Sequence, residues 1–259
     1  MEDLDPPREV PGAAADILET LAAFGMESDE PVIFQSRREA TYSAAFERLQ
    51  TMDCVFPCWC SRVDLEPFGG IHRGTCIAAP DPARAPAWRL RVPDNTIRFD
   101  DLGFGAQIQN LLESVGDFVI RRVEGWYAYQ LAAVVDDAEQ GITEVVRGAD
   151  LLDSTPRQIH LQRLLGLPAT EYLHLPLALD ADDRKLSKQD RARPVDRDYP
   201  VPVLRAALEF LSQRVPDTST PTAMLLAAAR DFDLAALRAA AHDAACTIES
   251  SPQQTRRGS

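Results

Sequence analysis

Hydrophobic positions recur along the chain with two different periods, and these periods predict the order of helices and strands. Helical spacing of apolar residues predicts helices over 10–24 and 39–52. Alternation or short apolar runs predict strands over 87–92, 96–100, 118–122, 142–146 and 172–179. Alanine-rich helical spacing returns over 201–214, 222–230 and 234–245. The pattern therefore predicts an α/β core followed by a small helical subdomain.

Shorter segments between these elements have weaker patterns. Residues 1–7 are predicted as the tail of a strand that runs into a loop, and residues 31–34 as a short strand. Residues 106–112 are predicted as one or two helical turns beneath the neighbouring strands. Gly25 is expected to end the first helix, because glycine adopts the left-handed conformation of a helix end without strain.

A strand, an apolar run and a second strand follow one another over 118–146. The run 126–135 fits a helix or a strand, and as a helix it would give the β, α, β order typical of a parallel sheet. Ser154 is expected to cap a helix over 155–164. Active sites of open parallel sheets lie beyond the carboxyl ends of the strands. Arg147 and the loop after the last predicted strand would lie there.

Residues 54–76 lack helical spacing and are rich in proline and glycine, which indicates that something other than a hydrophobic core holds them. The spacing Cys58-x-Cys60, eleven residues, His72-x-x-x-Cys76 supplies three thiolates and an imidazole, enough to close a tetrahedral zinc site. The alternative is three half-buried cysteines and a surface histidine. We favour zinc, because buried cysteine does not usually occur among proline and glycine. Such a zinc would be structural, and chelation should unfold the segment.

The chain contains only two lysines, Lys185 and Lys188, in the segment Arg184-Lys185-Leu186-Ser187-Lys188-Gln189. Lysine is a compact point charge on a flexible stem, which suits it to follow a phosphate through a reaction. Two lysines with a serine hydroxyl between them could grip a polyphosphate. A solvated surface turn after the acidic residues 180–183 explains the same pattern, and the spacing alone leaves both interpretations open.

Charge and composition narrow the class of protein. The formal charge of −13 counts against nonspecific coating of nucleic acid, although paired arginines leave room for a local basic path. No apolar run approaches the roughly 18 residues of a membrane helix, and the acidic N-terminus differs from a signal peptide. Five cysteines, three of them within 54–60, indicate reduced thiols or metal rather than a disulfide framework. We therefore predict a cytoplasmic protein without a membrane partner.

Several motifs together resemble one family, the glutamyl-queuosine tRNA(Asp) synthetases, which are relatives of the class I glutamyl-tRNA synthetases. These motifs are the zinc spacing and the segments 2–9, 129–137, 146–151, 174–177 and 185–188, so the resemblance covers nearly the whole chain. It implies an α/β fold with a class I synthetase, Rossmann-like parallel sheet, a small zinc-binding insertion and a C-terminal helical subdomain. Residues 185–188 would be the second class I signature loop, which grips ATP.

The resemblance also implies a reaction and its residues. Glutamate would be activated with ATP and Mg²⁺ to glutamyl adenylate and then passed to the cyclopentene diol of queuosine in tRNA(Asp). Glu2, Tyr129 and Arg147 match the glutamate contacts of the family, and Arg147 suits an anionic carboxylate. Lys185 and Lys188 match the catalytic loop, with Lys188 as the ATP contact. The family's zinc ligands match Cys58, Cys60, His72 and Cys76.

Two departures from the family concern the metal site and the N-terminus. The family commonly has tyrosine at the position of His72, and histidine is the better zinc ligand. The first class I signature, His-x-Gly-x, does not occur before Met1, so we expect a chain that lacks the first strand and helix of the sheet. A start codon assigned too far downstream and a genuine truncation both explain this, and we favour the first, because a genuine truncation would fold poorly and activate nothing.

The implied organisation is a partial catalytic core, a zinc module, a further part of the core, a helical subdomain and a disordered tail. Their bounds are 1–53, 54–77, 78–196, 197–249 and 250–259. We expect a monomer. A noncatalytic, zinc-containing RNA-binding relative of the synthetases is the alternative, and an unrelated nucleotidyl transferase is a third, which would leave the zinc spacing and Arg147 unexplained.

Overall fold

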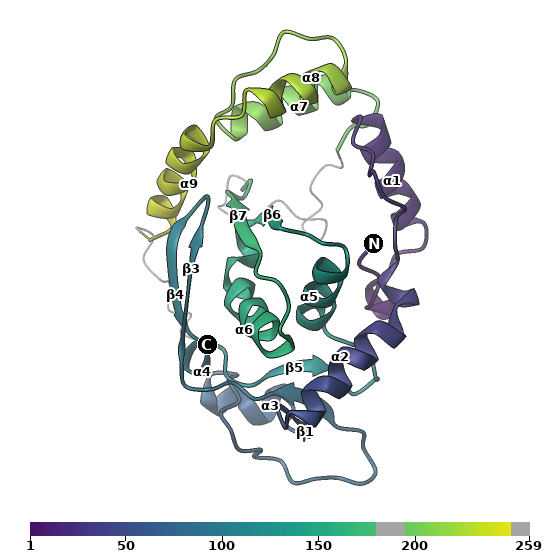
Figure 1. Ribbon diagram of the computed structural model, residues 1–259, viewed down its shortest axis with the longest axis vertical. Coiled ribbons are helices and arrows are strands. Elements are labelled where there is room, and N and C mark those ends of the chain that lie inside the picture. The colour runs from purple at the N-terminus through teal and green to yellow at the C-terminus, as the bar shows by residue number, and fades with distance from the viewer. Residues whose placement is uncertain (180–194, 250–259) are drawn as a thin grey trace, which may run out of the picture.

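The computed structural model describes residues 1–179 and 195–249 (Figure 1). The lysine loop with Lys185 and Lys188 and the predicted tail over 250–259 lie outside the described residues. Among the described residues, no helix is both long and apolar enough to cross a membrane.

The strands within residues 1–179 and 195–249 form two separate sheets. The first is antiparallel, in the order β1-β2-β5, and consists of β1 (Val55–Cys58), β2 (Ala87–Leu90) and β5 (Phe118–Arg121). The second has the order β4-β3-β7-β6 and consists of β3 (Thr96–Asp101), β4 (Gly105–Asn110), β6 (Glu144–Gly148) and β7 (Glu171–Leu175). In this second sheet β7 runs parallel to both β3 and β6, so three adjacent strands share their direction.

Helices surround and connect the two sheets. The longer ones are α1 (Ala13–Ala23), α2 (Glu39–Thr51), α5 (Tyr129–Glu139), α6 (Thr155–Leu165), α7 (Pro200–Phe210), α8 (Pro221–Arg230) and α9 (Leu234–Glu249). Short turns are α3 (Arg62–Leu65), α4 (Leu111–Ser114) and the 3₁₀ helices η1 (Pro6–Arg8), η2 (Gln35–Arg37), η3 (Glu66–Phe68) and η4 (Ala149–Ser154). In Figure 1, α7 and α8 lie at one end of the molecule and β1 and α3 at the other, with α5 and α6 between them.

The main hydrophobic core lies between α2, α5 and α6 and the strands. Leu49, Leu131 and Leu161 contribute one fully buried side chain from each of these helices, and Ile97 of β3 and Leu90 of β2 join the same cluster. The helical period predicts these helices because their apolar residues recur on the face that meets the strands. This packing fixes α5 and the start of α6 against the carboxyl ends of the second sheet.

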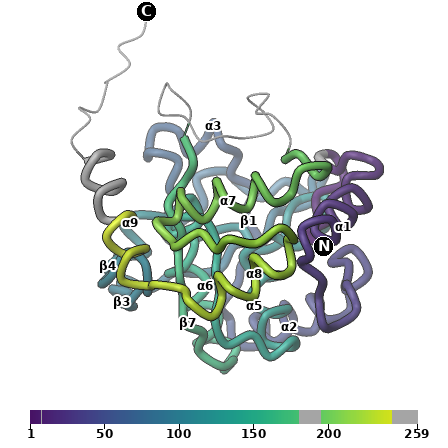
Figure 2. The backbone as a smooth tube through the Cα atoms, turned by 90° about the horizontal axis from the view of Figure 1, so that it is seen from above, coloured from purple at the N-terminus to yellow at the C-terminus, as the bar shows by residue number. Residues whose placement is uncertain are grey.

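A second core holds the C-terminal helices together and joins them to α1. Leu204 and Leu208 of α7 and Met224 of α8 pack with Phe24, which follows α1. Gly25 ends α1 in the left-handed conformation, with a φ of +71°, and a Cβ there would lie 2.7 Å from Oγ1 of Thr222. The predicted end of the first helix is thus confirmed, and Figure 2 shows α1 beside α7 and α8.

Two predictions about the sheets are wrong. Most of the segment 106–112, predicted as helical turns, is strand, because β4 pairs along its whole length with β3 as an antiparallel hairpin. Only its last two residues are helical, at the start of α4. The turn before β4 is closed by Asp101, whose side chain accepts the backbone N–H groups of Gly103 and Phe104. The run 118–146 is also not a parallel unit, because β5 pairs with β2 in the first sheet whereas β6 pairs with β7 in the second.

Smaller corrections concern the N-terminus and Ser154. Neither 1–7 nor 31–34 forms a strand. The two segments are nevertheless joined by a backbone hydrogen bond, which the N–H of Gln35 donates to the carbonyl of Met1 at 3.0 Å. Ser154 stands directly before α6 but makes no side-chain cap; its hydroxyl oxygen accepts from Gln130 at 3.1 Å instead. The helix there begins without that cap.

Candidate active site and metal centre

A pocket of about 360 Å³ lies at the carboxyl end of β6. Glu2, Tyr129 and Arg147, the three residues predicted to contact glutamate, all line it. They come from the N-terminal segment, the first turn of α5 and the carboxyl end of strand β6, which are far apart in the sequence. The structure therefore brings the predicted residues into a single pocket where an open parallel sheet binds its ligands.

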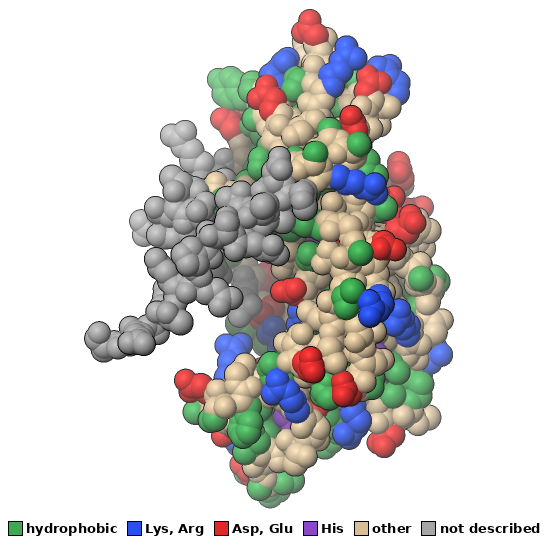
Figure 3. Space-filling model, turned by 90° about the vertical axis from the view of Figure 1, so that its left-hand side faces the viewer, with side chains coloured by type: hydrophobic (Ala, Val, Ile, Leu, Met, Phe, Trp, Pro, Cys, Tyr) green, Lys and Arg blue, Asp and Glu red, His purple; other side chains and the backbone are tan. Residues whose placement is uncertain are grey.

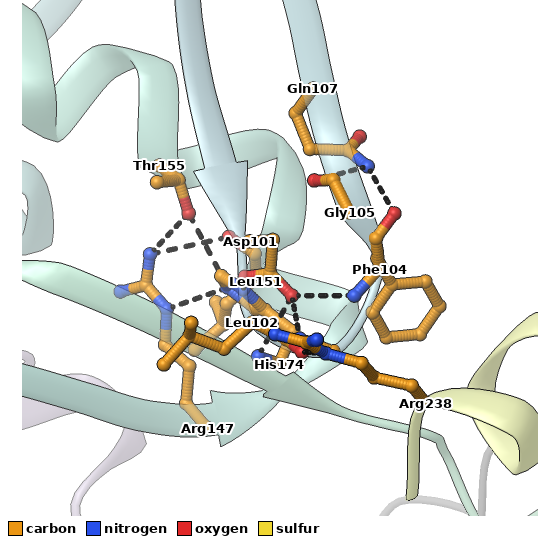
Figure 4. A network of polar contacts seen from close by, with 11 residues as sticks. Asp101, Leu102, Phe104, Gly105, Gln107, Arg147, Leu151, Thr155, His174 and Arg238 are labelled. Atoms are coloured by element: carbon orange, nitrogen blue, oxygen red, sulfur yellow. Dashed lines mark hydrogen bonds and ion pairs between the residues drawn. The ribbon is translucent and has the colours of Figure 1, made fainter. Parts of the chain in front are cut away.

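The Arg147 guanidinium is held from several sides. Its Nη1 donates to the Tyr129 hydroxyl at 3.3 Å, and its Nη2 donates to Oγ1 of Thr155 at 2.8 Å and to the Leu151 carbonyl at 3.5 Å. Its Nε donates to Nε2 of His174 at 3.1 Å. Figure 4 shows Thr155, Leu151 and His174 around the arginine. A planar guanidinium fixed in this way is preorganised for a carboxylate.

Three carboxyl groups, those of Glu2, Asp136 and Asp137, also line the pocket. Burial raises the pKa of Glu2 above its ordinary value, and nearby positive charges, including Arg147, offset part of that rise. Burial also raises the pKa of Asp137 to about 6, again against the pull of Arg147. The pocket therefore combines a guanidinium with two carboxyl groups, Glu2 and Asp137, whose ionised forms a bound cation would stabilise.

Asp136 anchors the pocket wall to α2. Its carboxylate accepts from Nε2 of Gln35 at 2.9 Å, Nε of Arg38 at 2.8 Å and the Tyr42 hydroxyl at 2.8 Å. Arg38 also pairs with Glu139 on the next turn of α5. Asp136 is buried, and these three donors satisfy it there. This cluster fixes η2 and the start of α2 against α5.

The four predicted zinc ligands lie together at the other end of the molecule. Cys58, Cys60, His72 and Cys76 each offer a ligand atom, and these atoms lie within 4.8 Å of one another. Cys58 ends β1, and Cys60 follows it in the turn that leads to α3. Cys54 lies outside this group. The cluster could hold a metal ion, and its donor set is that of a closed tetrahedral site.

The surroundings of the cluster fit a metal. His72 is buried; its Nδ1 lies 2.8 Å from Oδ2 of Asp117, and its Nε2 has no hydrogen-bond partner among the described residues. A histidine that ligates a metal commonly donates its other ring N–H to a carboxylate in this way. Burial opposes ionisation of Cys60, but backbone N–H groups of Ile77 and Ala78 outweigh it and lower the pKa of the thiol. Both observations favour a metal bound between these four side chains.

Comparison with known proteins identifies the chain. Residues 79–201 match the family model described as the catalytic domain of class I tRNA synthetases (E and Q). The chain is 55% identical over 223 residues to the glutamyl-Q tRNA(Asp) synthetase of Burkholderia cenocepacia, covering 82% of this chain and 75% of that protein. The Xanthomonas oryzae pv. oryzae protein of the same name is 53% identical over 236 residues, which cover 90% and 78%. This chain belongs to the glutamyl-Q tRNA(Asp) synthetase family.

The solved structures agree with this family at the level of the fold. A glutamate tRNA ligase from Elizabethkingia meningosepticum superposes with a TM-score of 0.72 at 24% identity, covering 90% of this chain and 57% of that one. The predicted α/β fold with a parallel sheet is thus confirmed. Members of the glutamyl-Q tRNA(Asp) synthetase family are ligases of the class I aminoacyl-tRNA synthetase type, as the motifs predicted.

Sequence reasoning missed the residues that support the pocket arginine and the histidine of the Cys/His cluster. His174 accepts a hydrogen bond from Arg147 and is itself paired with Asp101, and Asp117 is paired with His72. Asp101 and Asp117 each lie at the end of a strand or directly before one, which is a signal for a polar site at a sheet edge. Their partners are distant in the sequence, so the pairing itself is not visible there. The roles of Lys185 and Lys188 stay predictions.

Proposed function

We propose that the pocket binds L-glutamate, that the enzyme activates it with ATP and Mg²⁺, and that it transfers the glutamyl group to queuosine at the wobble position of tRNA(Asp). The observation that supports this best is the arrangement of Arg147, Glu2 and Tyr129 in one pocket at the carboxyl edge of the sheet. The names of the Burkholderia and Xanthomonas relatives support the choice of glutamate and of tRNA(Asp).

The pocket chemistry suits an amino acid with a second carboxylate. The Arg147 guanidinium would donate hydrogen bonds to the side-chain carboxylate of glutamate, with the Tyr129 hydroxyl holding Nη1 of Arg147 in place. Glu2 would accept the substrate ammonium, whose charge would favour the ionised form of this buried carboxyl group. A neutral side chain such as that of glutamine would leave the guanidinium without its counter-ion.

The reaction would proceed in two transfers. A carboxylate oxygen of glutamate attacks the α-phosphorus of ATP, pyrophosphate leaves, and glutamyl adenylate forms. A hydroxyl of the queuosine cyclopentene diol then attacks the activated carbonyl, and AMP leaves. Lys188, assisted by Lys185, would offset the charge that builds on the phosphates as pyrophosphate departs. A Mg²⁺ ion held by the phosphates of ATP would act in the same direction.

Cys58, Cys60, His72 and Cys76 would hold one structural zinc ion. The metal would stabilise the turn-rich segment 54–77, which we propose as a module inserted in the catalytic core. Its four protein ligands would leave no position for substrate, so the zinc takes no part in the transfers.

The RNA partner must bind a strongly acidic protein. On the face drawn in Figure 3, acidic and basic side chains of the described residues are interspersed rather than gathered by sign. With a formal charge of −13, binding would depend on a narrow path lined by arginine, and affinity should fall as salt rises.

The test is glutamate-dependent exchange of pyrophosphate into ATP, measured on this chain and on one extended by the codons upstream of Met1. We expect exchange with glutamate and not with glutamine or aspartate. Transfer of labelled glutamate is then compared on tRNA(Asp) with queuosine and on the same tRNA with guanosine at that position, and only the first should be labelled. Absence of exchange by the extended chain would contradict the proposal. Binding of tRNA without exchange would favour the noncatalytic alternative.

A further inference from the structure

A chain of hydrogen bonds runs from Asp101 through His174 to Arg147, which lines the pocket (Figure 4). Arg147 and His174 are register partners on the parallel strands β6 and β7, so their side chains lie on the same face. Asp101 ends β3, the next parallel neighbour of β7. Three adjacent strands therefore deliver an arginine, a histidine and an aspartate to the same sheet edge.

Hydrogen bonds determine which nitrogen of His174 carries its proton. Nε of Arg147 points its N–H at Nε2 of His174 across 3.1 Å. Because arginine only donates, Nε2 must be the acceptor and Nδ1 must carry the proton. The Nδ1–H group of His174 donates a hydrogen bond to Oδ2 of Asp101 at 2.6 Å. The imidazole and the carboxylate are both fully buried, so water does not replace either partner.

The Asp101 carboxylate is itself fixed by the backbone. Its Oδ1 accepts the N–H groups of Gly103 at 2.9 Å, Phe104 at 2.8 Å and His174 at 3.3 Å. The turn can approach this closely only because residue 103 is glycine, since a Cβ there would lie 2.3 Å from the His174 carbonyl oxygen. Arg238 of α9 donates to the Leu102 carbonyl in the same turn. The backbone N–H groups therefore hold Oδ1 of Asp101, which leaves Oδ2 for the imidazole of His174.

We infer that His174 and Asp101 are positioning residues that orient the Arg147 guanidinium toward bound glutamate, an inference that rests on the proposed function of the pocket. Neither residue lines the pocket, so neither touches the substrate. Asp101 selects the imidazole tautomer, the imidazole accepts the Nε–H of Arg147, and Thr155 accepts an Nη2–H. The Nη1 edge is thereby turned toward Tyr129 and the pocket.

Asp101→Asn tests the relay with a nearly isosteric change. The three backbone N–H groups require an oxygen at the Oδ1 position, so the new amide nitrogen must occupy the Oδ2 position and donate to Nδ1 of His174. The imidazole proton then moves to Nε2, where it meets the N–H of Arg147 donor to donor. We expect the KM for glutamate in pyrophosphate exchange to rise about tenfold or more, with the KM for ATP unchanged.

Nitrogen-15 NMR of the His174 ring reads the tautomer directly. The native chain should show the proton on Nδ1, and Asp101→Asn should show it on Nε2. Gln213→Ala is the control for lost stability, because Gln213 is a buried amide that bonds to Asp233 among the C-terminal helices, far from the pocket. This control should lower the melting temperature and leave the KM for glutamate unchanged.

A second pair of variants keeps the test decisive if Asp101→Asn does not fold. His174→Gln can offer an amide oxygen near the Nε2 position, whereas His174→Leu cannot accept a hydrogen bond. The glutamine variant should retain more glutamate affinity than the leucine variant.

Separate outcomes distinguish the relay from the proposed function. A native Nε2–H tautomer, equal KM values for native and Asp101→Asn, or equal affinities for the His174 pair would each overturn the relay. Failure of the native chain and its extended form to exchange pyrophosphate would overturn the proposed function, and with it the orientation toward glutamate.

Discussion

The metal cluster and the pocket are both built on a buried histidine paired with an aspartate. His72 Nδ1 lies 2.8 Å from Asp117, and His174 Nδ1 lies 2.6 Å from Asp101. In both pairs backbone N–H groups also bond to the carboxylate, from Gly74 in the first and from a β turn in the second. The inner half of each device is the same.

The two pairs differ in what contacts Nε2 of the histidine, and that difference determines which kind of group each region could bind. Nε2 of His72 faces the thiols of the cluster without a hydrogen-bond partner among the described residues, whereas Nε2 of His174 accepts from Arg147. A fixed lone pair toward thiolates makes a metal ligand, and a fixed lone pair toward a guanidinium makes an anchor for an anion site. In the proposed function, the same local pair would thus support binding of a cation in one region and of an anion in the other.

The largest effect should come from replacing Arg147, the residue that the His174–Asp101 pair holds in place. Arg147→Ala should lower kcat/KM for glutamate by about 10²- to 10³-fold, because a preorganised charged donor is lost. Arg147→Lys should be intermediate, since it keeps the charge and loses the planar fork. Exposed Arg98→Ala is the control and should change kcat/KM less than about twofold. Equal losses in both alanine variants would remove Arg147 from the pocket chemistry.

The corresponding change in the metal region removes a thiol. Cys60→Ser should abolish the bound zinc and lower the melting temperature by roughly 10 °C, because the turn-rich segment loses the metal that holds it. Cys54→Ser is the matched control, since Cys54 is a half-buried thiol outside the cluster. Metal analysis and thermal unfolding measure both variants. Full zinc occupancy in Cys60→Ser would rule out the four-ligand site.

Exchanging the two aspartates for asparagine tests whether the two pairs act separately. Asp117→Asn should weaken zinc binding about 10- to 100-fold, measured by competition with a chromophoric chelator, because His72 loses its carboxylate partner. Asp101→Asn should leave zinc affinity unchanged. If both variants weakened zinc binding equally, the effect would be general destabilisation rather than the loss of a partner for the ligand.

The smallest effect concerns two carboxyl groups of the pocket region whose pKa values shift in opposite directions. Burial opposes ionisation of Asp101, but hydrogen bonds from His174 and the backbone outweigh it and lower its pKa, whereas burial raises the pKa of Asp137 to about 6. A raised pKa contributes stability below about pH 4, and this contribution is lost as pH rises through about 6.

Asp137→Asn should therefore be more stable than the native chain at pH 7, by roughly 1 kcal/mol after allowance for solvent screening. The difference should disappear below about pH 4. Urea unfolding at several pH values measures it, with exposed Asp29→Asn as the control. A native chain that is the more stable at pH 7 would reverse the assigned shift.

Much of the fold follows from periodicity. Helix α2 and the C-terminal helices were predicted within a few residues, because their apolar faces recur every three to four positions and meet a core. The β3–β4 hairpin was missed, because its signal is an aspartate that folds over its own turn rather than an alternating run. The grouping of strands into two sheets depends on pairing partners, which no local pattern specifies.

The candidate site divides in a similar way. The spacing of Cys58, Cys60, His72 and Cys76 is local enough to predict a cluster, and the structure brings these residues together. Asp117 lies 45 positions from His72, and Asp101 lies 73 positions from His174, so neither supporting carboxylate could be paired from the sequence. The residues predicted to contact a ligand occur in recognisable motifs, whereas the pairing of the carboxylates that support them depends on the tertiary fold.

The separation of Asp101 and His174 also bears on folding. A contact across 73 positions forms only after a long loop has closed, so the edge of the second sheet should be completed late. A ligand held at that edge binds the finished fold and not its partly folded forms, and so stabilises the finished fold. Resistance of the chain to proteolysis should therefore increase with the concentration of glutamate around it.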